Sequence, residues 1–103
     1  MFKINPKPVF RATVPLSVPG SDKPAAIAVD FKHLGKSALR DYFAGLEGKS
    51  DAEALAEIVT GWEGVDTPFS AEALGQLLDN YPAAAGELFE AFRRELLEAR
   101  AKN

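Results

Sequence analysis

The apolar residues of this chain repeat every second position near its start and with the spacing of a helix further on. Over residues 10–18, apolar positions alternate with polar or proline positions, and a similar alternation returns over residues 26–32. Such alternation is typical of strands that have one buried face. Six residues rich in turn formers, 19–24, separate the two runs, so the sequence predicts a β-hairpin over residues 10–32. Because Pro15 has no N–H to donate, we expect its strand to lie at an edge of the sheet.

From about residue 36 the period becomes that of a helix. Three groups follow the spacing i, i+3, i+4, i+7, namely Leu39, Tyr42, Phe43 and Leu46, then Leu55, Ile58, Val59 and Trp62, then Leu74, Leu77, Leu78 and Tyr81. This spacing predicts three amphipathic helices. Pro82 disfavours continuation of the third helix and suits the start of another, so a fourth helix is expected from about residue 82 to 100.

Capping residues support these helices and suggest where they begin and end. Ser50 and Glu53 form an S-x-x-E capping box, and Ser70 is placed as the N-cap of the third helix. The glycines at positions 45, 48, 61 and 64 are expected at helix ends.

The two periods together predict a single α+β domain over residues 1–103. Its N-terminal β-hairpin, residues 10–32, would pack on about four short α-helices within a helical region, residues 36–100. Residues 1–9 contain two prolines and are expected to form an extended arm. An isolated hairpin is marginally stable in water, so the helices should cover its apolar face.

The sequence offers little for catalysis. It has no cysteine, which excludes a disulfide framework, a thiol nucleophile and a cysteine-based zinc site. Its one histidine, His33, is expected in a turn without a second imidazole to complete a metal site. Neither a G-x-S-x-G motif nor a phosphate-binding glycine loop is present. We therefore expect a protein that is not an enzyme and that has no catalytic, cofactor or metal site.

Charge is distributed unevenly along the chain. Residues 1–40 carry seven lysines and arginines and two acidic residues, a net charge of +5, whereas residues 41–103 carry five and thirteen, a net charge of −8. The difference reflects either two solvated faces of opposite sign, or head-to-tail attraction between copies in a homo-oligomer, or a basic face that meets an acidic partner. The overall charge of −3 disfavours nucleic acid as a partner. The sequence shows neither a membrane span nor a signal peptide, so the cytoplasm is the expected compartment.

Several aromatic residues are candidates for contact with another protein. Trp62 and Tyr81 end their helical groups, and Phe69 precedes a helix cap. Phe89 and Phe92 lie on the apolar side of the fourth helix, and Leu97 lies on its polar side. Core packing is the simpler interpretation of the aromatics, and a groove for a partner helix is the alternative. The candidate partner-binding residues are Trp62, Phe69, Tyr81, Phe89, Phe92 and Leu97.

Several short motifs, taken in order, resemble a known family. They are D-F-K-H at 30–33, G-W-E-G-V-D at 61–66, P-F-S-A-E-A-L at 68–74, L-L-D-N-Y-P-A-A at 77–84 and A-R-A-K-N at 99–103. In this order and spacing they are similar to the tail assembly chaperones of long-tailed bacteriophages. The resemblance covers most of residues 25–103.

The resemblance implies an assembly factor without catalytic activity, made by a phage or prophage and acting in the host bacterial cytoplasm. Such a protein would bind the tape measure protein, keep it soluble and help to recruit tail tube protein. A longer frameshifted form of the same chain would be a further partner. The alternative is a small structural protein of the phage tail or virion. An enzyme and a DNA-binding regulator rank below both.

Overall fold

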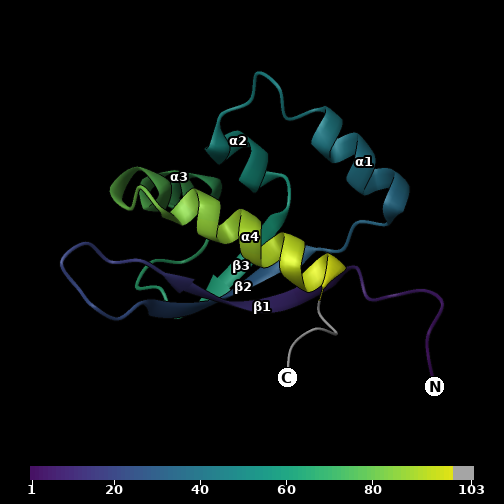
Figure 1. Cartoon of the computed structure of the whole chain (residues 1–103), viewed down its shortest axis with the longest axis horizontal. Coiled ribbons are helices and arrows are strands. Elements are labelled where there is room, and N and C mark those ends of the chain that lie inside the picture. Colours follow the sequence, from purple (N-terminus) through teal and green to yellow (C-terminus); the bar gives the residue numbers. More distant parts are fainter. Residues whose placement is uncertain (99–103) are drawn as a thin grey trace.

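A three-stranded antiparallel sheet and four helices make up the fold. The computed structural model describes residues 1–98. In chain order the elements are β1 (Val9–Leu16), β2 (Ala25–Lys32), α1 (Lys36–Ala44), α2 (Asp51–Ala56), β3 (Val59–Glu63), α3 (Ala71–Asn80) and α4 (Ala84–Leu97). α4 packs on β1 and contacts α2 and α3 (Figure 1). The predicted α+β fold is confirmed, although the expected extension of the last helix to residue 100 lies outside the described residues.

β1 and β2 form the hairpin that the alternating sequence predicts. Val14 pairs with Ile27, and side chains that face each other in this way lie on one side of the sheet. Val14, Val29 and Phe31 are fully buried on that side. The strand order is β1-β2-β3, so Pro15 lies in an edge strand, as predicted.

The other face of the sheet is held together by charged side chains. The Arg11 guanidinium in β1 donates two hydrogen bonds to Asp30 in β2, at 2.8 and 3.0 Å, and a third to Glu63 in β3, at 2.6 Å. These bonds stabilise the ionised carboxylate and hold the pKa of Asp30 below its ordinary value. One arginine therefore links all three strands on the solvent-exposed face.

The third strand is a correction to the sequence analysis. The spacing over residues 55–62 predicts one helix, but α2 ends at Ala56 and Val59–Glu63 form β3. Three β-branched residues, Ile58, Val59 and Thr60, follow α2 ahead of Gly61, and all of these are poor helix formers. The free edge of β2 offers them backbone partners instead. Gly61, expected at a helix end, consequently lies inside a strand.

A β-bulge explains why this strand has the spacing of a helix. The pairing of β2 with β3 shifts by one residue at Thr60. In a regular strand, Val59 and Trp62 would point to opposite faces, because successive side chains alternate. With the bulge, Val59 lies opposite the buried Phe31 and Trp62 opposite the buried Val29. The i, i+3 spacing therefore belongs to one face of a bulged strand.

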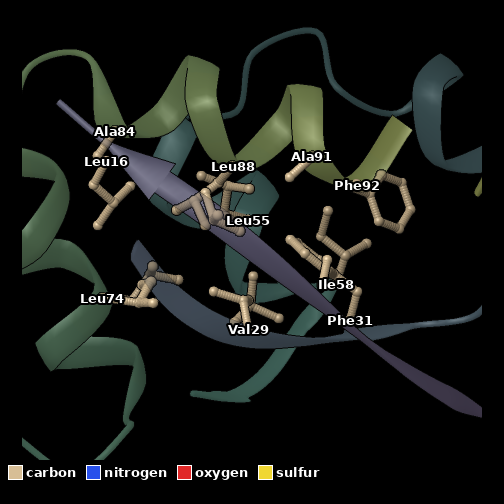
Figure 2. Close-up of a cluster of buried hydrophobic side chains, with 14 of the residues drawn as sticks. Leu16, Val29, Phe31, Leu55, Ile58, Leu74, Ala84, Leu88, Ala91 and Phe92 are labelled. Carbon is tan, nitrogen blue, oxygen red and sulfur yellow. The ribbon is translucent and has the colours of Figure 1, made fainter. Parts of the chain in front are cut away.

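The main core lies between the sheet and α4. Phe92 of α4 packs against Phe31 of β2, with ring centroids 5.4 Å apart, and against Phe10 of β1 at 6.1 Å. Figure 2 shows that side chains from the sheet, α2, α3 and α4 meet in one hydrophobic cluster. Leu55 and Leu88 are among its fully buried members. The helices thus cover the apolar face of the hairpin, as expected.

Two serines begin helices as predicted. Ser50 and Glu53 form the complete capping box of α2, and the Ser70 hydroxyl accepts a hydrogen bond from the third residue of α3. α3 ends before Tyr81, whose backbone is extended. α4 begins at Ala84 rather than at Pro82, because Pro82 lies in a turn that the Ala84 N–H closes onto the Tyr81 carbonyl.

α1 is joined to the rest of the fold through Tyr42. The Tyr42 side chain is buried, and its hydroxyl donates to the Ala54 carbonyl of α2 at 2.7 Å. Burial raises the pKa of Tyr42 to about 12, because the ionised phenolate would lose hydration. The neighbouring Phe43 is 44% exposed, and Gly45 follows the last residue of the helix, as expected.

Candidate protein-binding groove

Three of the candidate aromatic residues lie near one another at the junction of β3 and α3. Trp62 in β3 and Phe69, just before α3, are in edge-to-face contact, with ring centroids 5.1 Å apart and planes at 87°. Trp62 and Tyr81 line the same hollow. The fold therefore gathers residues that the sequence places up to nineteen positions apart.

Two adjoining hollows form a groove beside α3. Their volumes are about 250 and 280 Å³, and four residues line both: Val65, Asp66, Leu77 and Tyr81. The first is also lined by Trp62, Thr67, Ala73, Gln76 and Asn80, and the second by Leu16, Val18, Ala25, Ile27 and Gly64. We call this set of residues the α3 groove.

The loop after β3 forms one wall of the groove. Gly64 has a φ of 91°, a conformation that glycine adopts more readily than other residues. The chain turns there, and the Trp62 indole N–H donates to the Thr67 carbonyl at 2.8 Å. This hydrogen bond holds the indole ring against the loop. Val65 belongs to the short segment that the bond encloses, between Trp62 and Thr67. The wall is therefore shaped by a glycine turn and one side-chain hydrogen bond.

The end of α3 forms the opposite wall. Pro82 disfavours helical backbone at the residue before it, and Tyr81 accordingly has φ −125° and ψ 94°. The Tyr81 N–H still donates to the Leu77 carbonyl, at 3.0 Å. Leu16 and Ile27, at the hairpin end of the sheet, line the second hollow. The Tyr81-Pro82 sequence thus ends the helix where the helix meets the hairpin.

The groove is part apolar and part polar, and it carries one charged side chain. Trp62, Val65, Leu77 and Tyr81 are each half-buried. Asp66 is the only charged residue among the described residues that line either hollow. Its carboxylate accepts a hydrogen bond from the Thr67 hydroxyl at 3.0 Å, and no ion pair within residues 1–98 involves it. The groove therefore suits an apolar segment that carries a positive charge.

The three candidate residues of α4 lie elsewhere. Phe92 is 1% exposed and belongs to the core. Phe89 is half-buried and packs against that core. Leu97 is 58% exposed near the end of α4. None of the three lines the α3 groove, and Phe92 in the folded chain has no surface to offer a partner.

Sequence reasoning missed most of the groove. Val65 and Asp66 lie in a loop, where no periodic pattern marks them. The helical spacing predicts Leu77 on the apolar face of the third helix. The C-terminal part of that face, at Leu77 and Tyr81, lines the groove. The one local signal for the groove is Val65, an apolar residue directly after the turn glycine Gly64 and close to Trp62. That signal does not reveal which other segments of the chain pack beside Val65.

The described part of the chain shows no metal centre. Within residues 1–98, no group of three or more histidine, cysteine or acidic side chains is arranged to hold a metal ion. His33 lies between β2 and α1, where its backbone N–H donates to the Pro8 carbonyl at 2.8 Å. In that same part of the chain, no helix has the length and hydropathy required to cross a membrane.

Comparison with known proteins places the chain in a family. No curated protein and no solved structure matches it. The model of one family, described as phage tail assembly chaperone, matches residues 1–103 and so covers the whole chain. This agrees with the motifs at 30–33, 61–66 and 68–84. The protein is therefore a member of the phage tail assembly chaperone family.

Proposed function

We propose that the α3 groove binds an apolar segment of the tape measure protein, keeps that protein soluble in the host cell and thereby assists assembly of the tail tube. The observation that carries this proposal is the set of four large apolar side chains, Trp62, Val65, Leu77 and Tyr81, left half-buried around one groove. Tryptophan and tyrosine are enriched among the residues that carry binding energy at protein contacts.

The division of the groove into two hollows suits two side chains of a macromolecule. Each hollow, at about 250 or 280 Å³, is by itself smaller than the roughly 300–1,000 Å³ typical of ligand pockets, although the two together fall within that range. An amphipathic helix places apolar side chains one turn apart on one face, and two of these can enter two adjoining hollows. Asp66 lies at both hollows, where it would pair with a lysine or arginine flanking that face.

The groove also supports a role in binding rather than in catalysis. Acid–base and nucleophilic mechanisms need a second group that activates or orients the first. Asp66 is the one acidic or basic side chain among the described residues lining the groove, and its hydrogen-bond partner is the Thr67 hydroxyl. A carboxylate in this setting can attract a cation, and among the described residues no second acidic or basic side chain lines the groove beside it.

Tail tube protein and a longer frameshifted form of this chain are proposed as further partners. Both follow from the family resemblance. A frameshifted form that shares the folded region would present the same groove, so it would bind the same segment of the tape measure protein.

Co-expression with the tape measure protein of the same phage tests the proposal. The wild-type chain should keep that protein in the soluble fraction and co-purify with it. Val65→Asp places a charge in the groove but lies in a loop, so it should weaken co-purification about tenfold or more while leaving the circular dichroism spectrum unchanged.

Phe43→Asp is the matched control, because Phe43 is 44% exposed on α1 and does not line the groove. It should co-purify as the wild type does. Undiminished binding by Val65→Asp would contradict the proposed site. Finding the protein in purified virions would instead favour the alternative, a structural component of the tail, because an assembly chaperone should be absent from the finished particle.

A further inference from the structure

The first eight residues form an apolar and basic arm that the fold leaves in solvent. Phe2 is 94% exposed and Ile4 87%. The first anchored atom is the Pro8 carbonyl oxygen, which accepts the His33 N–H. Residues 1–7 make no hydrogen bond, ion pair or ring contact with any other part of the chain that the structure describes. The arm therefore exposes large apolar side chains that contribute nothing to this fold.

The chemistry of the arm complements that of the α3 groove. Apolar Phe2 and Ile4 alternate with Lys3, and Lys7 adds a second positive charge. Trp62, Val65 and Leu77 give the groove apolar surface, and it also holds Asp66, which no described lysine or arginine neutralises. The same complementarity holds for the whole chain, which is basic over residues 1–40 and acidic beyond them.

Two prolines restrict the second half of the arm. Residues that precede a proline avoid helical backbone, so Asn5 and Lys7, which precede Pro6 and Pro8, favour extended conformations. That half of the arm therefore loses less conformational freedom when it binds. Two adjoining hollows can receive Phe2 and Ile4, whose side chains lie on one side of an extended strand.

The arm leaves one end of the hairpin, whereas the groove extends from the middle of the sheet, where Trp62 pairs with Val29, to the other end. The arm leaves β1 at Val9, which pairs with Lys32, whereas Leu16 and Ala25 line the groove at the other end. In Figure 1 the N-terminus points away from α3. β1 spans about 23 Å, and an eight-residue arm reaches about 26 Å when fully extended. Measured from Val9, Phe2 lies about 23 Å along a fully extended arm and Ile4 about 17 Å, so a folded-back arm could bring Phe2 no further than the level of Leu16 and would leave Ile4 short of it.

We propose that residues 1–8 of one copy occupy the α3 groove of a second copy. This inference rests on the proposed function. The arm and the tape measure protein would then compete for the same groove. Copies would associate through their arms when no tape measure protein is present. The incoming tape measure segment would displace the arm, so the groove would be covered until it is needed.

The full-length double variant Phe2→Ser/Ile4→Ser tests self-association. Sedimentation equilibrium of the wild type should show a mass that rises with protein concentration and falls with salt. In the double variant, the dissociation constant should rise about tenfold or more, because two apolar side chains no longer leave water. Phe43→Ser, which changes another exposed phenylalanine, should associate as the wild type does. A monomeric wild type, or a double variant that associates normally, would overturn the proposal.

The single tryptophan of the chain, Trp62, reports on the groove directly. A synthetic peptide of residues 1–8, added to the double variant, should change the fluorescence of Trp62 in a saturable way. Asp66→Asn should weaken this binding severalfold, and a peptide with serine in place of Phe2 and Ile4 should abolish it. An unchanged fluorescence would overturn the assignment of the arm to the groove.

Competition separates this inference from the proposed function. The peptide should displace the tape measure protein from the double variant. If Val65→Asp abolishes binding of the tape measure protein but the peptide does not compete, the proposed function stands and the arm proposal fails. If the peptide binds at Trp62 and Val65→Asp leaves the tape measure complex intact, the arm occupies the groove but the proposed function fails, and with it the competition.

Discussion

Phe92 and Leu97 lie on the same helix and should respond to mutation in opposite ways. Phe92 is 1% exposed, and its ring lies 5.4 Å from that of Phe31, 6.1 Å from that of Phe10 and 6.2 Å from that of Tyr42, measured between centroids. Leu97 is 58% exposed. Phe92→Ala removes the ring at the centre of the contact between α4 and the sheet, whereas Leu97→Ala removes a side chain mostly in water.

The free energies follow from these environments. Replacing a buried phenylalanine by alanine costs about 3–5 kcal/mol, whereas a domain of this size is stable by about 5–15 kcal/mol. At about 4–8 °C per kcal/mol, Phe92→Ala should lower the Tm by at least about 12 °C. Phe92→Leu retains most of the apolar volume and should cost about 1.5 kcal/mol or less. Leu97→Ala should stay within about 0.5 kcal/mol of the wild type.

Urea denaturation followed by far-UV circular dichroism measures all three variants against the wild type. The expected order of unfolding free energies is wild type and Leu97→Ala together, then Phe92→Leu, then Phe92→Ala, with similar m-values. If Phe92→Ala unfolds within 1 kcal/mol of Leu97→Ala, a difference below the roughly 3 kcal/mol expected, then Phe92 is not a core residue and the reasoning fails.

Three further predictions concern the helices and the sheet. Gly75→Ala should raise the unfolding free energy by about 0.4–1 kcal/mol, because nothing beyond its own helix lies within 4 Å of the added Cβ. Gly64→Ala should lower the unfolding free energy by more than that, because residue 64 has a φ of 91°. Equal effects of the two substitutions in urea denaturation would contradict this. Arg11 holds the pKa of Asp30 below 3.8, so the carboxylate stabilises the fold above that pH and the stabilisation is lost as pH falls through the lowered pKa. The difference in stability between wild type and Asp30→Asn should therefore shrink in acid, and a constant difference across the pH range would refute the role of the ion pair. Leu97→Asp should weaken association with a partner or with other copies while the helical signal stays intact, and unchanged association would remove Leu97 from the proposed contacts.

Local sequence signals predicted those features that depend on neighbouring residues. The alternation over residues 10–18 gave the buried face of β1, and Ser50, Glu53 and Ser70 marked the starts of α2 and α3. The strand β3 was missed because its identity depends on distant residues. Its bulge at Thr60 produces helix-like spacing, and only the free edge of β2 makes a strand the better solution.

The sequence by itself determined the hairpin, the approximate positions of four helices and the resemblance to the tail assembly chaperones. These follow from periodicity, capping, prolines and short motifs, all of which act over a few residues. Only the tertiary structure decided that Phe92 lies in the core and that Trp62, Val65, Leu77 and Tyr81 share a groove. The reason is physical: a groove forms where a strand end, a loop and a helix end meet, and their packing depends on contacts between segments far apart in the chain.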